Sequence, residues 1–256
     1  MNEKASITTQ VVEIKAQGSG SLDWTERILD KLTEPVVCSC SAPLEAGTVK
    51  LKKPQIFLED ADKAEIGDYI RVMLTNGQVM RFDVTDIGDG WVRFDSHDCI
   101  GSHSWNDNGK NEGGIEASDL QKYIDTEISK LLPDYLTELI IDTERRFAQY
   151  DDDGEHTEDS FKTKLFIPDA SEVFEPDDGW YAPIYEQLEY YKDRRNRMKG
   201  KEPEAKETAN WWTASVSSGN ATHVVYVNAS GYSGNGNASG ARCVPVCFRI
   251  ATKSHE

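Results

Sequence analysis

The C-terminal stretch from Asn210 to Ile250 constrains the fold more than any other part of the chain. It begins with two tryptophans, Trp211 and Trp212, and it ends with a valine-rich run at residues 244–250. Between these apolar ends lie short apolar runs separated by glycine, serine and asparagine. Because strands bury their aromatic residues while Asn, Gly and Ser loops stay solvated, the stretch predicts core strands that carry an exposed polar surface. A surface that displays side chains to a ligand is therefore our first functional hypothesis.

Turn signals earlier in the chain predict a small antiparallel sheet. Asn76 and Gly77 separate two apolar runs, and an Asn-Gly pair favours a hairpin because it accepts positive φ angles. A second turn, from Gly88 to Gly90, leads into a further apolar run. The strands predicted by these turns are residues 70–73, 79–84 and 91–95.

A helix is predicted from Asp119 to about Leu132. Ser118 is followed three residues later by Gln121, which is the spacing of a capping box, and Pro133 should end the helix. Apolar residues recur at helical spacing and should face the core. They are Leu120, Ile124, Ile128 and Leu131.

Composition and local pattern assign the remaining segments. We expect a loop at 102–114, a buried strand or short helix at 136–141, a polar connection at 142–164, a strand at 164–167, a helical turn at 171–174, a helix at 181–198 and a single strand at 244–250. Together with the sheet, these elements predict an α+β fold. We expect residues 1–47 to form an N-terminal arm or small subdomain, and residues 48–256 to form the main domain.

The charge balance excludes some partners. The chain has 45 acidic and 28 basic residues, a net charge of −17, which repels nucleic-acid backbones and anionic membranes. The basic run at residues 192–201 has acidic neighbours, so we interpret it as the solvated end of a helix, and an anionic partner for it stays open as an alternative. No apolar run approaches the ~20 residues of a membrane helix, and the polar start lacks a signal-peptide core. We therefore expect cytosolic synthesis, no membrane insertion and no nucleic-acid partner.

The order of several segments resembles an uncharacterised bacterial and phage family. Its members carry a GGxxxSDLxxYI-like helix, a KLF[LI]PxASEVF segment, a YExxxYYKD segment, an NWW start and a close that contains AxGxR. The corresponding segments here are 113–124, 164–174, 185–193, 210–215 and 227–246. The C-terminal half of that family is similar to the C-type-lectin fold, in the variant shared by formylglycine-generating enzymes and the variable proteins of diversity-generating retroelements. The resemblance implies small twisted antiparallel sheets, two or more helices and long ordered loops.

The resemblance also implies a ligand-binding face. In the variable proteins this face lies in the region that corresponds to residues 212–246, and its substituted positions are often asparagine. Tyrosine combined with small polar residues is also typical of adaptable recognition surfaces. A plainer alternative stays open, in which the repeated NASG at residues 228–231 and 237–240 is simply a turn used twice. The candidate ligand-binding residues are Asn220, His223, Tyr226, Asn228, Tyr232, Asn235 and Asn237.

Two C-terminal cysteines need separate consideration, because formylglycine-generating enzymes use a nearby pair. In one extended strand the Cα atoms of Cys243 and Cys247 would be about 13 Å apart. A disulfide requires less than about 7 Å, so the pair cannot bridge unless the strand bends at Pro245. The five cysteines of the chain are an odd number, which fits reduced thiols. We therefore interpret the pair as small residues packed in a strand and predict no enzymatic activity.

The sequence predicts no metal site and no cofactor. Acidic residues around Gly154 lack the alternating spacing of a calcium loop, so we interpret them as solvated, although calcium binding stays open. His97, Cys99 and His103 lack a fourth zinc ligand at a recognisable spacing. Sequons at three asparagines are interpreted as a product of composition. The acidic residues are Asp151, Asp152, Asp153 and Glu155, and the sequon residues are Asn220, Asn228 and Asn237.

These observations favour a non-enzymatic recognition module that binds a protein or glycan. The occurrence of the resembled family in phages suggests a tail-associated or surface adhesin, incorporated into a virion. An alternative is a structural assembly protein without a ligand pocket, which forms a homo-oligomer through residues 1–47. An oxidoreductase of the formylglycine-generating type is a distant third.

Overall fold

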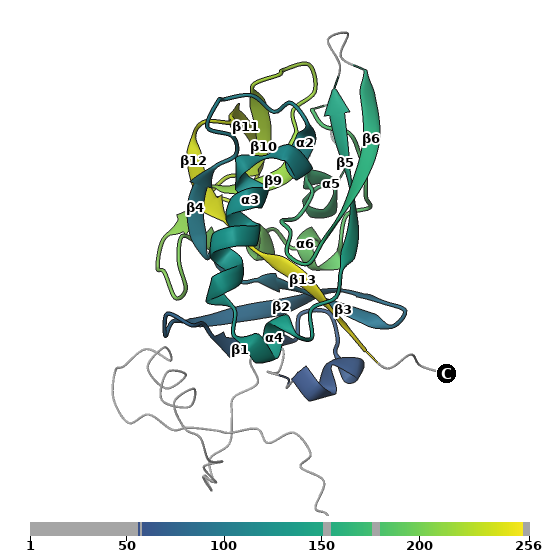
Figure 1. Cartoon of the computed structure of the whole chain (residues 1–256), viewed down its shortest axis with the longest axis vertical. Coiled ribbons are helices and arrows are strands. Elements are labelled where there is room, and N and C mark those ends of the chain that lie inside the picture. The colour runs from purple at the N-terminus through teal and green to yellow at the C-terminus, as the bar shows by residue number, and fades with distance from the viewer. Residues whose placement is uncertain (1–55, 57, 151–154, 176–179, 253–256) are drawn as a thin grey trace, which may run out of the picture. The chain divides into compact units, whose positions relative to one another are not determined.

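The fold of the described residues is α+β, built from two main sheets, a helical segment and a long hairpin (Figure 1). The computed structural model describes residues 56, 58–150, 155–175 and 180–252. The predicted N-terminal arm at residues 1–47 lies outside them. A short 3-10 helix, η1 (Leu58–Lys63), precedes the first strand. No helix among the described residues is long and apolar enough to cross a membrane.

Sheet A contains the predicted N-terminal hairpins. Gly77, with φ of 85°, and Gly90, with φ of 75°, lie in their turns and adopt a conformation that glycine accepts without strain. The antiparallel pairing of the three predicted strands is confirmed. The sheet has the order β1-β2-β3-β13, with β1 (Tyr69–Met73), β2 (Val79–Gly88), β3 (Trp91–Ser96) and β13 (Cys247–Ala251).

Sheet B holds most of the C-terminal stretch. It has the order β11-β10-β9-β12-β4, and only the β12–β9 pair is parallel. The prediction of a loop throughout residues 102–114 is wrong at its start, because these residues begin within β4, which pairs with β12. The strands are β4 (Gly101–Ser104), β9 (Trp211–Val216), β10 (His223–Val227), β11 (Ser233–Asn237) and β12 (Ala241–Val244).

The prediction of one continuous strand at residues 244–250 is also wrong. The chain leaves sheet B after Val244 and enters sheet A at Cys247. Pro245 lies at this change of sheet, where a residue without an N–H is tolerated because no ladder bond is needed. Alternate residues of this run nevertheless all belong to the core between the sheets. They are Val244, Val246, Phe248 and Ile250.

The predicted helix at residues 119–132 is confirmed as a helical segment of changing pitch. Ser118 caps its start by accepting a hydrogen bond from the backbone N–H of Gln121 at 2.9 Å. Leu120, Ile124 and Ile128 are fully buried, whereas Leu131 is partly exposed. The segment passes through α3 (Asp119–Tyr123), a π-helical turn η2 (Ile124–Ile128) and a 3-10 turn η3 (Ser129–Leu131), with α2 (Gly114–Ala117) before it and α4 (Asp134–Thr137) after it.

The polar stretch at residues 142–164 contains a hairpin that the sequence pattern did not predict, formed by β5 (Thr143–Tyr150) and β6 (His156–Thr163). Figure 1 shows this hairpin along one side of the molecule. Most of β6 is exposed, so its sequence lacks the apolar alternation that identifies a strand. The hairpin is fixed through β5, which buries Thr143, Arg145 and Phe147 on one face.

The long helix predicted at residues 181–198 is wrong as well. Only α6 (Glu189–Lys192) and a 3-10 turn η4 (Arg194–Arg197) are helical there. Pro183 disfavours a helix through the first half, and the tyrosines reach the core from irregular backbone. Lys199 is buried, so the basic run is not simply a solvated helix end. The neighbouring elements are α5 (Ala170–Val173), which confirms the predicted turn, and a small ladder of β7 (Lys199–Gly200) and β8 (Thr208–Ala209).

Two apolar cores support the sheets. The larger core joins one face of sheet A to one face of sheet B and to the α3–η2 segment. The smaller core lies on the other face of sheet B, where residues of α5 and α6 cover Trp211, Val225 and Val227. Sheet B is therefore covered on both faces near β9, and its outer strand β11 lies at its margin.

Candidate functional site

The tryptophan pair anchors the candidate surface. Trp211 and Trp212 are both fully buried, and they point to opposite faces of β9 because side chains alternate along a strand. The indole Nε1 of Trp211 donates to the carbonyl of Arg197 at 2.8 Å, and that of Trp212 donates to the carbonyl of His103 at 3.0 Å. The predicted burial of both indoles is confirmed, and it fixes β9 against both cores.

The candidate residues lie along the β10–β11 edge of sheet B, but they do not share one face. In the β10–β11 ladder His223 pairs with Asn237, so both side chains lie on the same face, which Asn235 also shares. Tyr226 points to the opposite face and packs against the larger core. The others lie outside the strands, with Asn220 before β10 and with Asn228 and Tyr232 between β10 and β11. Asn220, Tyr232, Asn235 and Asn237 are exposed, and His223, Tyr226 and Asn228 are half-buried.

Three of the candidate asparagines stabilise their own turns. The side-chain oxygen of Asn220 accepts a hydrogen bond from the N–H of Thr222 at 3.0 Å. Asn228 and Asn237 repeat this contact with the N–H groups of the residues two positions later, Ser230 at 2.9 Å and Ser239 at 3.0 Å. These are Asx turns, in which the side chain replaces a backbone turn contact. Asn228 and Asn237 therefore have the turn-forming role that the repeated NASG segment suggests.

Asn235 and Tyr232 have more freedom to meet a ligand. Asn235 lies in the middle of β11, and its amide nitrogen makes a long contact of 3.4 Å with the hydroxyl of Ser217. Tyr232 is 56% exposed, and the guanidinium of Arg194 stacks on its ring at 4.9 Å. An exposed, partly immobilised tyrosine is a favourable contact residue because little conformational entropy is lost on binding.

Arg242 is a site residue that the sequence pattern did not identify. Its guanidinium lies 3.8 Å from the ring centre of Tyr226 and 4.6 Å from that of Trp212. Burial lowers the pKa of Arg242 below its usual range. Arg242 is the arginine of the AxGxR motif, so the motif could have drawn attention to it. The sequence does not show which aromatic rings of other strands it contacts.

A buried ion network connects sheet A to α5, on the face of the sheet that points away from the larger core. Glu172 accepts hydrogen bonds from Arg93 at 2.6 Å and from Arg145 at 2.7 Å, and Arg93 also binds Asp95 at 2.7 Å. Burial would raise the pKa of Glu172, but the two guanidinium groups outweigh burial and lower it to about 2. Tyr191 donates its hydroxyl to Asp95 at 2.8 Å. Every charge in this network has a partner, which indicates a structural role.

Cys243 and Cys247, which the sequence predicts to be packed strand residues, lie in two different sheets. Cys243 lies in β12 of sheet B and Cys247 lies in β13 of sheet A, because the chain changes sheets between them. Cys247 is completely buried, and burial raises the pKa of its thiol well above the usual range. A hydrogen bond from the thiol of Cys99 lowers the pKa of Cys243, while burial raises the pKa of Cys99 well above its usual range. The surroundings of Cys99 and Cys247 are those of structural cysteines.

The structure brings no metal-ligand group together among the residues that it describes. His97 binds Asp83 at 2.7 Å and His103 stacks on Tyr123. The two histidines considered as zinc ligands therefore have separate partners. The acidic residues Asp151, Asp152 and Asp153 lie outside the described residues. Glu155 is described and exposed.

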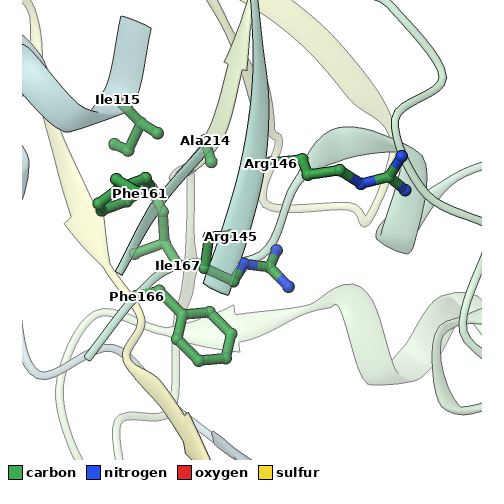
Figure 2. A pocket seen from close by; sticks show the side chains of 7 residues that line it. All are labelled: Ile115, Arg145, Arg146, Phe161, Phe166, Ile167 and Ala214. Carbon is green, nitrogen blue, oxygen red and sulfur yellow. The ribbon is translucent and has the colours of Figure 1, made fainter. Parts of the chain in front are cut away.

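A small cavity beside the β5–β6 hairpin has a volume of about 10 Å³, which is room for about one water molecule. Figure 2 shows the guanidinium of Arg146 directed away from the apolar side chains, whereas that of Arg145 lies over the ring of Phe166, 4.4 Å from its centre. The cavity is too small for an organic substrate. It is lined by Ile115, Arg145, Arg146, Phe161, Phe166, Ile167 and Ala214.

Comparison with known proteins identifies one family. Residues 79–252 match the model of a domain of unknown function, DUF6273. This range begins with β2 and ends just after β13, so it includes all of sheet B and every strand of sheet A except β1. No curated protein and no solved structure matches the chain.

Proposed function

The chain belongs to the DUF6273 family, and from its site geometry we propose that it is a non-enzymatic recognition module whose binding surface is the β10–β11 end of sheet B. One observation carries the proposal. Exposed Asn220, Tyr232, Asn235 and Asn237 lie in β11 or at the ends of the β10–β11 pair, along the margin of a sheet whose central strand is anchored in two cores. Polar, turn-rich segments on a rigid scaffold are typical of recognition surfaces.

The proposed ligand is a protein or a glycan. The resemblance to C-type-lectin-like variable proteins supports this class, because their ligands bind at the corresponding region. We extend the proposal to that fold and to a tail-associated or surface adhesin carried by a virion. The negative charge of the chain supports the exclusion of nucleic acid as the ligand.

The proposal leaves out catalysis for a physical reason. Cys243 and Cys247 lie in different sheets, and the thiol of Cys247 is held neutral by burial. The one cavity described above admits about one water molecule. A surface that binds a macromolecule needs no such cavity, since interfaces of that class are broad and shallow.

A paired screen tests the proposal. The full chain would be presented to a glycan array and to a library of displayed random peptides. We expect ligands that bind the wild type and lose at least about tenfold in affinity when Tyr232, Asn235 and Asn220 are all replaced by alanine. A melting temperature close to that of the wild type would show that the variant folds. Failure of both screens, or equal binding by the variant, would contradict the proposal.

A structural assembly protein is the second candidate, and one observation favours it. The side-chain oxygens of Asn220, Asn228 and Asn237 are occupied by their own turns. Light scattering after size-exclusion chromatography distinguishes the two functions. A stable homo-oligomer that buries the exposed asparagines would favour assembly, and a monomer with an open surface would favour recognition.

A further inference from the structure

One of the two outer strands of sheet B, β11, has a side that no described strand covers. β11 pairs with β10 on one side and with no other strand in the described part of the chain. At the end of this ladder, Ala238 donates its N–H to the carbonyl of Thr222 at 2.8 Å. Because backbone groups point to alternate sides along a strand, Gly236 and Gly234 also direct theirs toward β10.

The alternate residues of β11 direct their backbone groups outward. They are Ser233, Asn235 and Asn237, and the carbonyl of Asn237 is already used by the N–H of Gly240 at 3.0 Å. A row of backbone groups therefore lies along the free edge of β11. It consists of the outward N–H groups of all three residues and the carbonyls of Ser233 and Asn235. Such a row is a template for an added strand. The SGNGN sequence of β11 contains no lysine or proline that would protect this edge.

Arg242 reaches this edge from another strand. It belongs to β12, but its guanidinium stacks on Trp212 of β9 and on Tyr226 of β10. A Cβ added to Gly236 of β11 would lie only 2.2 Å from Nη2 of Arg242. The guanidinium therefore lies over Gly236, and the missing side chain of this glycine gives it the space.

The Arg242 guanidinium has no acceptor among the described residues. Its contacts are the two aromatic rings, and its Nε is buried without a hydrogen-bond partner. A buried N–H without a partner costs free energy that a ligand acceptor can recover. The planar guanidinium fork matches a carboxylate better than other acceptors, because two parallel hydrogen bonds can form.

We propose that the free edge of β11 binds an extended peptide segment of a partner protein as an added strand, with Arg242 paired to a carboxylate of that segment. This inference rests on the proposed recognition function and specifies its ligand. The ligand residue opposite Gly236 would point to the same face of the sheet as Arg242, with its Cα about 4.5–5.5 Å from that of the glycine. An aspartate or glutamate at this position brings its carboxylate to the guanidinium. Since the whole chain carries a charge of −17, the segment has a single carboxylate rather than an acidic run.

Two displayed peptide libraries test the inference on the full chain. Both randomise the flanking positions, but one fixes a central glutamate and the other a central glutamine. We expect the glutamate library to be enriched. Arg242→Leu should weaken the selected peptides about tenfold or more, because a charge-assisted hydrogen bond is lost. Asn235→Pro should also abolish binding, since proline removes an outward N–H without breaking a bond to β10.

Arg249→Leu provides the matched control. Arg249 also stacks on a tryptophan, Trp91, at 3.6 Å, and its Nε is also buried without a partner. It lies in β13 of sheet A, so peptide affinity should not change. Melting temperatures would confirm that all three variants fold.

The outcomes separate this inference from the proposed function. Equal enrichment of the two libraries, or peptides that still bind Arg242→Leu and Asn235→Pro, would overturn the edge-strand inference and leave recognition intact. Binding of glycans but of neither peptide library would overturn it in the same way. A dimer that Asn235→Pro dissociates would assign the edge to a second copy of the chain. Failure of glycans and peptides alike would overturn the recognition function as well.

Discussion

Arginines occupy contrasting settings on the two sheets. On sheet A, Arg93 is completely buried, and its guanidinium binds both Asp95 and Glu172. On sheet B, Arg242 is half-buried between two rings and meets no carboxylate among the described residues. A buried charge that is paired with a carboxylate of another segment, as that of Arg93 is with Glu172, holds the two segments together. A charge that is desolvated but unpaired is available to a ligand.

The difference also separates stability from recognition. The network around Glu172 joins β3, β5 and α5, so its loss should affect the whole fold. Arg242 covers the end of a sheet, so its loss should affect binding more than folding. Each prediction below tests one side of this difference.

The largest effect is expected from Glu172→Gln. The substitution leaves the buried guanidinium groups of Arg93 and Arg145 without their shared counter-charge, which should lower the free energy of unfolding by about 3–5 kcal/mol. Urea denaturation measures this change. Glu158→Gln is the control, because Glu158 forms an exposed ion pair with Arg146 at 3.5 Å and should cost less than about 1 kcal/mol. Equal losses in the two variants would contradict the structural role of the network.

The pH dependence of stability should show the same network. The pKa of Glu172 is lowered in the folded state from 4.5 to about 2, so its contribution is fully present above about pH 4.5 and is lost as the pH falls toward 2. The wild type should therefore lose more stability than Glu172→Gln over this range. Burial raises the pKa of Asp169, which acts in the opposite sense, but this group is present in both proteins. Parallel curves for the two proteins would contradict the prediction.

Gly236→Ala should weaken peptide binding with little loss of stability. The added Cβ would lie 2.2 Å from Nη2 of Arg242, so the guanidinium must move. We expect about a tenfold loss in affinity for the glutamate peptides, with a change in unfolding free energy below about 1 kcal/mol. In an Arg242→Leu background the same substitution should have no further effect on affinity. An additive loss in the double variant would show that Gly236 acts independently of Arg242.

The smallest effects should distinguish the asparagines. Asn237→Ala removes the acceptor for the N–H of Ser239, at 3.0 Å, and for its hydroxyl, at 2.8 Å, which should cost about 1 kcal/mol of stability. Asn235→Ala removes only the long contact to Ser217 and should stay within about 0.5 kcal/mol of the wild type. Thermal unfolding of both variants measures the difference. A reversed order would mean that Asn235, and not Asn237, stabilises the fold.

Local signals explain what the sequence could predict. The Asn-Gly turn at Gly77, the cap at Ser118 and the burial of Trp211 and Trp212 each depend on neighbours along the chain or on simple hydrophobicity. The anchoring of the candidate surface was therefore accessible from the sequence.

Long-range pairing explains what the sequence could not predict. The exposed strand β6 has no apolar alternation and is recognisable only through its pairing with β5. The run at residues 181–198 contains tyrosines that hydrogen-bond buried carboxylates of sheet A, so tertiary contacts outweigh helical spacing there. The role of Arg242 depends on the order β11-β10-β9-β12, which no local pattern encodes.

The most direct test of the central claim follows the arginine side chains by NMR. The Nε–Hε signals of the full chain would be recorded during titration with a selected glutamate peptide. If Arg242 is the available guanidinium, its signal shifts and saturates, while the signals of Arg93 and Arg145 remain in place. An Arg242 signal that does not move at saturating peptide would contradict the account.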